Sequence, residues 1–399
     1  MRPGRDMSAV SGPPPLNVPA DRRVLLPLYA AGFVTAFGAH SVAAGLGAYA
    51  GQQHTSLLTL GILLAVYDGA EVVLKPVFGT LADRVGPRPV LLGGLLAFAL
   101  ASAAFVIVGN AALLGVVRFA QGAAAAAFSP SAGALIARLS PGTRRGRVFG
   151  GYGAFKSLGY ASGPVVGGLL IVSGGYGRLF VTLAGLALAV TGWAAFAVPA
   201  VPPLYRGRQT LLDLLRRLRS ANFLQPTMTL AAATAALAVG VGFLPVVGRL
   251  AGMTPVFTGA AVSLLAGAGV LVQPWAGRAR DDGRLTDRLG MGVGIGLAAV
   301  GMLCTAIFPT AAGVLAAAML LGVGSGLATP FAFAHLAGST PADRLGQTMG
   351  AAEVGREVGD AGGPLLVGAV AAALTLNWGL ALLALLLGAV ALINLRLRR

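Results

Sequence analysis

The sequence is poor in charge and in cysteine. Only 11% of its 399 residues are charged, whereas soluble domains carry about 25%, so there are too few polar residues to cover a water-soluble particle. The single cysteine, Cys304, excludes an intrachain disulfide and makes a thiolate metal site improbable. The sequence has no phosphate-binding loop of the form GxxxxGK[ST] and no zinc-like or serine-nucleophile motif, so it supports neither an ATP-driven pump nor an enzyme.

What the chain does contain is apolar. Hydrophobic residues make up 56% of it, and the mean hydropathy is +0.81. Apolar segments recur from Val24 to Leu395, each near or above the roughly 20 residues that cross a bilayer as a helix. They lack the alternation of a membrane barrel, and the 60 glycines fit closely packed membrane helices. The sequence predicts an all-α polytopic protein embedded in a lipid bilayer.

The net charge of +16 reflects membrane topology rather than a nucleic-acid partner. Most basic residues lie in the two termini and in five inter-helix loops, which alternate with nearly uncharged loops. This is the positive-inside pattern, and it places both termini in the cytoplasm. The preference for Arg over Lys, with the Ala and Gly richness, favours a bacterial chain, hence a multi-pass protein of the plasma (inner) membrane.

Alternation of charged and uncharged turns predicts twelve spans, of which the fifth covers about 147–173 and the sixth about 177–199. The expected organisation is a disordered cytoplasmic tail, a six-helix bundle, a cytoplasmic basic linker, a second six-helix bundle and a short cytoplasmic tail, at 1–23, 24–200, 201–222, 223–395 and 396–399. Leucines among arginines at 211–218 suit either a short amphipathic surface helix or a plain linker.

An internal repeat relates the two halves. The segment from Ser129 matches the segment from Thr329 at an offset of 200 without a gap, and a second match runs at an offset of 198. Six spans separate the copies, so both begin on the same side and the halves are parallel repeats about an axis along the membrane normal. The matched pairs include Pro130 with Pro330, Gly163 with Gly363, Pro164 with Pro364, Gly79 with Gly277 and Asp83 with Asp281.

Three motifs follow one another in the first half. After the second span comes "GTLADRVGPRP", with Gly79, Asp83, Arg84, Gly86 and Arg88. The fourth span carries "RFAQG", with Arg118. The fifth carries "GYASGPVVGG", with Gly159, Gly163, Pro164, Gly167 and Gly168.

Together these motifs resemble those of the major facilitator superfamily, and the resemblance covers essentially the whole chain. It implies two six-helix bundles and a loop at 79–88 that latches them on the cytoplasmic side, where Asp83 meets a helix N-terminus and Arg84 or Arg88 pairs with neighbouring acids. Pro87 and Pro89 depart from the family pattern, and the second copy, "GRARDDGR", looks degenerate.

The same resemblance ties Arg118 to proton coupling and associates the fifth-span motif with the drug:proton antiporter, or efflux, branch. Its glycines and proline, with Gly363 and Pro364 of the repeat, are expected to act as a hinge, because proline removes a backbone hydrogen bond and glycine permits sliding contact.

Ionisable residues interrupt two of the apolar spans. Asp68, Glu71 and Lys75 share one helix face, and so do Glu353, Glu357 and Asp360. Embedded charges cost several kcal/mol unless paired or hydrated, so they should face a wet centre or each other. The predicted proton-coupling set is Asp68, Glu71, Arg118, Glu357 and Asp360, with Glu71 and Asp68 leading. The competing interpretation is static ion pairs, such as Lys75 with Glu71, while Glu353 would meet only the Arg-rich loops.

A second set is expected to line a substrate cavity: His40, Tyr67, Lys75, Tyr152, Lys156, His335 and Arg356. No ligand spacing joins the histidines, so no metal is expected, and no cofactor beyond the proton gradient. The sequence favours, for this predicted monomer, proton-coupled efflux of small amphipathic or cationic compounds. The alternatives are proton-linked transport of one polar or anionic metabolite, and lipid translocation.

Overall fold

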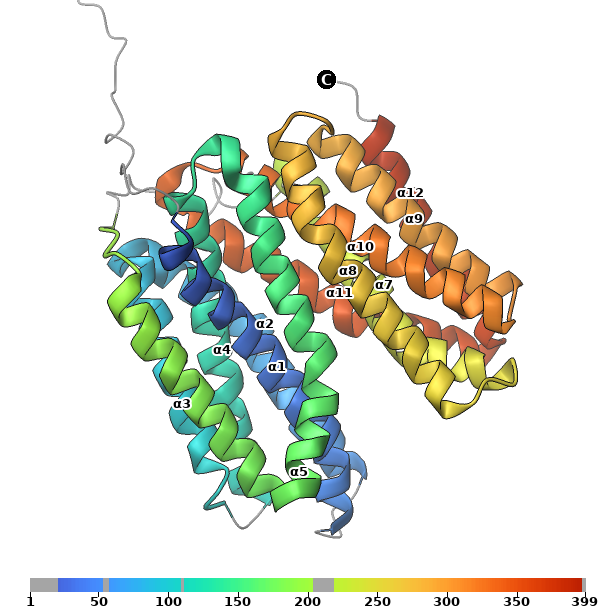
Figure 1. Cartoon of the computed structure of the whole chain (residues 1–399), viewed down its shortest axis with the longest axis horizontal. Helices are drawn as coiled ribbons and strands as arrows, with labels where there is room; N and C mark the ends of the chain where they lie inside the picture. The colour runs from blue at the N-terminus through green and yellow to red at the C-terminus, as the bar shows by residue number, and fades with distance from the viewer. Residues whose placement is uncertain (1–20, 53–56, 109–110, 204–218, 397–399) are drawn as a thin grey trace, which may run out of the picture.

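The structure is a computed structural model that describes residues 21–52, 57–108, 111–203 and 219–396 (Figure 1), and the side chains of these residues except 43–52, 57–65, 111 and 255–256. Most of the predicted N-terminal tail and the possible amphipathic helix at 211–218 lie outside these ranges. Within them, every regular element is helical.

The first bundle contains α1 to α5 and the second α7 to α12. The first comprises α1 (Arg22–Gln52), α2 (Leu57–Val85), α3 (Pro87–Ala104), α4 (Ala111–Leu139), the short η1 (Gly142–Arg144) and α5 (Arg145–Ala197). The second comprises α7 (Ala221–Leu250), α8 (Pro255–Asp281), α9 (Asp287–Ile307), α10 (Ala311–Ser339), the short η2 (Ala342–Arg344), α11 (Leu345–Ala373) and α12 (Leu376–Arg396).

Helix α5 contains two of the membrane spans. It is broken at Gly174 and Gly175, where Gly175 has φ 71, in the left-handed region that glycine adopts at little cost. This break falls between the predicted fifth and sixth spans. The eleven α-helices of the described residues therefore provide twelve spans, and the predicted fold class is confirmed.

The helices meet through small residues at several crossings, and many large apolar side chains face outward. Gly294 of α9 and Gly324 of α10 lie so close that a Cβ on either would overlap the other helix's backbone. Leu169, Phe196 and Leu271 are 63%, 95% and 77% exposed on the outside. A surface of this kind suits contact with lipid chains rather than water.

Nine of the described helices are long and apolar enough to cross a membrane by length and composition. Neither α2 nor α11 is among them, and α11 carries four ionisable residues in its middle. These two helices pack against each other across the two bundles, so the charged helices lie at the interface.

The bundles converge at one end and diverge toward the other (Figure 1). At the converging end α2 packs on α11 and α5 packs on α8. Helix α1 begins and α12 ends at this same end, which is also where the Arg-rich helix termini gather. The four interface helices are related in pairs by the sequence repeat.

Candidate functional site

Two glycine pairs bring the bundles into backbone contact at the converging end. A Cβ on Gly79 of α2 would overlap the carbonyl oxygen of Gly346 of α11, and a Cβ on Gly277 of α8 would overlap that of Gly146 of α5. Both contacts are reciprocal, since a Cβ on Gly346 or Gly146 would also meet its partner's carbonyl. Glycine is thus required at these four positions by close approach.

Asp83, at the end of α2, caps the start of α11. Its Oδ1 accepts a hydrogen bond from the Gly346 amide and its Oδ2 accepts one from the Gln347 amide, both at 2.8 Å. The side chain is 1% exposed. A carboxylate at a helix N-terminus satisfies orphan N–H groups and complements the helix dipole. The cap joins the two bundles.

The repeat copy at the end of α8 also carries an aspartate that caps a helix of the other bundle. The expectation that this copy is degenerate is therefore wrong for Asp281. Asp281 Oδ1 accepts from the Gly146 amide at 2.8 Å and Oδ2 from the Arg147 amide at 2.7 Å. Here too a carboxylate of one bundle caps a helix of the other. The letters around Asp281 differ from the first motif, but the spacing from Gly277 is kept.

The basic residues of the first loop behave differently from the expectation. Arg88 donates to the carbonyl of Ala195 at 2.6 Å instead of pairing with an acid, and Arg84 is exposed. The arginine near Asp83 is Arg138 of α4, with Nη2 3.5 Å from Oδ1. Gly86 supplies the turn between α2 and α3 with φ 99.

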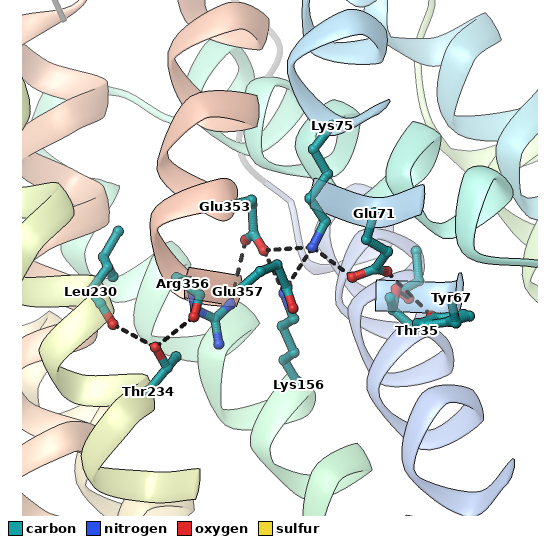
Figure 2. Close-up of polar contacts among 11 residues, drawn as sticks. Thr35, Tyr67, Glu71, Lys75, Lys156, Leu230, Thr234, Glu353, Arg356 and Glu357 are labelled. Atoms are coloured by element: carbon teal, nitrogen blue, oxygen red, sulfur yellow. Dashed lines mark hydrogen bonds and ion pairs between the residues drawn. The ribbon is translucent and has the colours of Figure 1, made fainter. Parts of the chain in front are cut away.

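One step deeper, Lys75 of α2 lies among three carboxylates (Figure 2). Its Nζ is 2.7 Å from Glu71 Oε2 on the same helix, 2.5 Å from Glu357 Oε1 on α11, and 3.8 Å from Glu353 Oε2. The residue is 1% exposed. It therefore ties the first bundle to the second at a point shielded from solvent.

Glu353 of α11 is a carboxylate that also contacts two further cations. Its Oε2 is 3.0 Å from Nζ of Lys156 on α5, and its Oε1 is 3.4 Å from Nη1 of Arg356 one turn along. The expectation that Glu353 meets only the Arg-rich loops is wrong. Arg356 in turn lies where its backbone carbonyl accepts from Thr234 of α7 at 2.8 Å (Figure 2).

We call Glu71, Lys75, Lys156, Glu353, Arg356 and Glu357 the central network. The chain contains only two lysines and three glutamates, and all five belong to it. Elsewhere the chain uses Arg and Asp for its charges. Removing one member of a buried ionic set typically costs about 3–5 kcal/mol, because its partner is left buried and unpaired.

Arg118 of α4 lies beside the network rather than in it. Its guanidinium carbon is 4.3 Å from the centre of the Tyr67 ring, and its Nη1 donates to Gln121 at 2.7 Å. Gln121 donates in turn to Ser102 at 3.1 Å, which fixes the amide's orientation. The Tyr67 hydroxyl donates to Glu71 at 3.2 Å. Tyr67 thus connects the arginine to the network.

Asp68 and Asp360 lie toward the diverging end from the network. Asp68 is exposed and Asp360 is half-buried, and the two interact electrostatically with each other and with Glu357. His40 of α1 packs its ring edge on Tyr160 at 4.2 Å. Its Nδ1 is 3.0 Å from the Ala36 carbonyl. A carbonyl only accepts, so Nδ1 carries the hydrogen.

Two residues predicted for the cavity lie elsewhere, one near the converging end and one in the packing between α1 and α5. His335 of α10 is near the converging end, with Nδ1 2.9 Å from Asp287 Oδ2, and Asp287 also accepts from Arg280 at 2.6 Å. Tyr152 is 3% exposed and packs where a Cβ on Gly32 of α1 would meet its ring. His335 therefore belongs with the contacts of the converging end.

The glycines of the predicted hinge are packing positions in this state. A Cβ on Gly159, Gly163 or Gly167 would meet α1, whereas one on Gly168 would meet nothing within 4 Å. In α11, Gly363 packs on Ala235 of α7, which repeats the arrangement. Helices α5 and α11 continue through Pro164 and Pro364.

Sequence reasoning missed the roles of Glu353, Asp281, Arg138 and Gln121. The repeat offset carried the signal for Asp281, since it aligns that residue with Asp83. Arg138 and Gln121 act through contacts between helices that no local pattern reveals. Among the described residues, no group of three or more His, Cys, Asp or Glu is arranged to hold a metal ion.

Two repeated six-span bundles, joined at one end and ionically bridged inside the membrane region, define a secondary transporter. The sequence matches the model of the Major Facilitator Superfamily over residues 28–286, more than half of the chain. The chain belongs to this superfamily, whose members are transporters rather than enzymes.

Known proteins that are similar to this chain are consistent with its membership of this superfamily. Multidrug resistance protein MdtG of Escherichia coli is 29% identical over 146 residues, which cover 36% of each chain, so this chain spans about a third of the length of that curated relative. The human organic anion transporter MFSD10 superposes with a TM-score of 0.79, 15% identity and coverage of 94% of this chain and 100% of that one. The E. coli fucose:proton symporter FucP gives 0.75, 15%, 93% and 98%. These two similarities concern the fold.

Proposed function

We propose that the protein is a proton-coupled exporter of small amphipathic or cationic compounds that works by alternating access. The observation that carries the proposal is the central network, in which Lys75 bonds to carboxylates of both bundles. The similarity of part of the chain to a multidrug resistance protein supports export. The fifth-span motif supports the same direction.

The network offers a physical link between protons and bundle movement. If the converging end is to separate, Lys75 must leave Glu357 and Lys156 must leave Glu353. Protonation removes the carboxylate charge that holds each pair, so a bound proton and a bundle contact exclude each other. Burial of these pairs makes the exclusion strong, because unpaired buried charges are costly.

We assign the converging end to the cytoplasm of a bacterial cell, from the positive-inside pattern of its loops. The state described is then closed to the cytoplasm, and the chain works as a monomer in the plasma membrane. Asp68 and Asp360, toward the diverging end, would receive protons from outside. The loop at 79–88 and its repeat would latch this state.

A second candidate is transport of a polar or anionic metabolite. Lys156 and Arg356 favour it, because both are buried cations on facing helices and fixed positive charge suits a carboxylate or phosphate. Loss of transport of an anion on Lys156→Ala, with no movement of cations in the parent protein, would select this candidate.

The test uses liposomes that contain the protein and an internal pH dye. A proton gradient is imposed, and cations, neutral amphiphiles and organic anions are added in turn. The proposal expects cations or amphiphiles to drive protons the opposite way, and Glu71→Gln with Asp68→Asn to abolish this. Asp21→Asn, an exposed acid just before α1, is the control. Intact coupling in the double variant would remove α2 from proton transfer, and co-movement of protons and solute would overturn export.

A further inference from the structure

The side chain of Lys75 fills a site built for a positive charge. Three carboxylates surround its Nζ, and the two from α11 belong to the opposite bundle. Figure 2 shows the Lys75 chain reaching from α2 into this group. An ammonium is therefore already bound at the junction of the bundles, and its source is the protein itself.

The two α11 carboxylates are not equivalent. Glu353 has two further cationic partners, Lys156 and Arg356, and its side chain is 3% exposed. Glu357 has Lys75 as its ion-pair partner among the described residues, and its side chain is 15% exposed. When the bundles part, Glu353 keeps Arg356 on its own helix, but Glu357 loses its cation.

Lys75 can separate from Glu357 and still keep a counter-ion. Glu71 lies one turn before Lys75 on the same helix, with Oε2 2.7 Å from Nζ, so this pair does not depend on contact between the bundles. The Tyr67 hydroxyl holds Glu71 from the other side at 3.2 Å. The ammonium therefore keeps a counter-ion on its own helix, and the charge that changes environment is that of Glu357.

The net charge of the ionisable residues around this junction decides which kind of ligand can replace Lys75 at Glu357. In the first bundle three such cations and two such acids give a net charge of +1, and in the second bundle one cation and three acids give −2. The sum is −1, which one proton or one monovalent cation neutralises and an anion would worsen. The residues counted are Lys75, Lys156, Arg118, Asp68 and Glu71, then Arg356, Glu353, Glu357 and Asp360.

We propose that Glu357 is an exchange site for a single positive charge, occupied in turn by the Lys75 ammonium, by a proton and by the charged group of an organic monocation. Lys75 is a tethered competitor that expels the transported cation as the converging end closes. A proton from the other side then displaces Lys75 and permits the return. This rests on the proposed function and names its substrate class.

The first experiment measures binding to the purified protein. The probes are ethidium and tetraphenylphosphonium, whose permanent charge cannot arise from proton transfer. We expect Glu357→Gln to weaken binding at least about tenfold and Lys75→Gln to tighten it at least about tenfold, while Lys75→Arg binds like the parent. Arg284→Gln, an exposed cation, is the control. Thermal unfolding of each variant, and retention of binding by Glu357→Asp, separate the effect from misfolding.

The second experiment separates the inference from the proposed function. In liposomes we measure ethidium accumulation driven by a pH gradient and ethidium exchange at equal pH. Lys75→Gln is expected to lose most of the driven accumulation and to keep the exchange, because the cation then stays bound through both movements. If the binding pattern holds but no gradient drives the parent protein, proton-coupled export fails and the exchange site stands.

The inference itself is overturned by any of three results. One is a parent protein that exchanges protons for cations while Lys75→Gln is unaltered in both binding and coupling. Another is Glu357→Gln that binds the probes as tightly as the parent. The third is a parent protein that binds neither probe but binds an organic anion through Lys156.

Discussion

The aspartates that cap the facing helices should hold the converging end closed with similar strength. Asp83 and Asp281 each accept two backbone N–H bonds of 2.7–2.8 Å from the opposite bundle. Hydrogen bonds to a charged group contribute about 1.5–3 kcal/mol each. Asn can still accept one bond but carries no charge, so Asp83→Asn should destabilise this state by roughly 2 kcal/mol.

A change of roughly 2 kcal/mol corresponds to about a 30-fold shift in the ratio of the two conformations. Asp281→Asn should shift it as much, and the double variant by roughly the product, because the two caps share no residue. If the second motif copy were truly degenerate, only Asp83→Asn would act.

The assay measures the distance between the bundles at that end. Thr143 of η1 and Ala342 of η2 are exposed and belong to different bundles. Spin labels at these two positions, in a Cys304→Ser background, give the distance distribution by pulsed electron resonance. We expect a longer-distance population to grow in both single variants. An unchanged distribution in Asp281→Asn, beside a shifted one in Asp83→Asn, would refute the equivalence of the caps.

Three further predictions concern packing and the network. Gly79→Val should abolish transport and leave the converging end open in the spin-label assay, because its side chain would overlap the facing carbonyl, whereas Gly69→Ala, with nothing within 4 Å of its added Cβ, should transport normally. Gly163→Ala should lower the unfolding temperature, while Gly168→Ala leaves it unchanged; equal values would show that α5 does not need close packing on α1. Tyr67→Phe keeps the ring beneath the arginine but loses one hydrogen bond, so its transport should exceed that of Tyr67→Leu, and the reverse order in a liposome assay would contradict the stacking role.

Whether a feature can be predicted from the sequence depends on how far apart in the chain the interacting residues lie. The fold follows from patterns that local physics enforces: apolar length sets the spans, and the repeat sets the two bundles. The break between the fifth and sixth spans also falls where predicted, at Gly174 and Gly175. Each of these signals lies in consecutive residues, so one sequence is enough to read them.

The partners of the charged residues are a different matter. Helical periodicity brings Lys75 and Glu71 together, and the sequence indicated that pair. It cannot indicate that Glu357, 282 residues away, completes the group, because this depends on the rotation of α11 against α2. The Gly79 and Gly346 contact, where the absence of side chains lets the backbones touch, is one of the contacts that fix this rotation.

The internal repeat also helps to predict contacts between residues that lie far apart in the sequence. Because each bundle offers one aspartate-capped interface helix, the copies must dock reciprocally, α2 on α11 and α8 on α5. Symmetry therefore predicts an ionic bridge at both interfaces, yet only the α2 side carries Lys75, and Gln273 of α8 takes the corresponding neighbourhood with a hydrogen bond to Ser157 at 2.7 Å. A buried lysine therefore occupies this position in one of the two related interfaces only, so the exchange of protons and cations should act on α2 and α11. Gln273→Glu should perturb coupling, because it places a buried acid at the position that Lys75 occupies in the other copy.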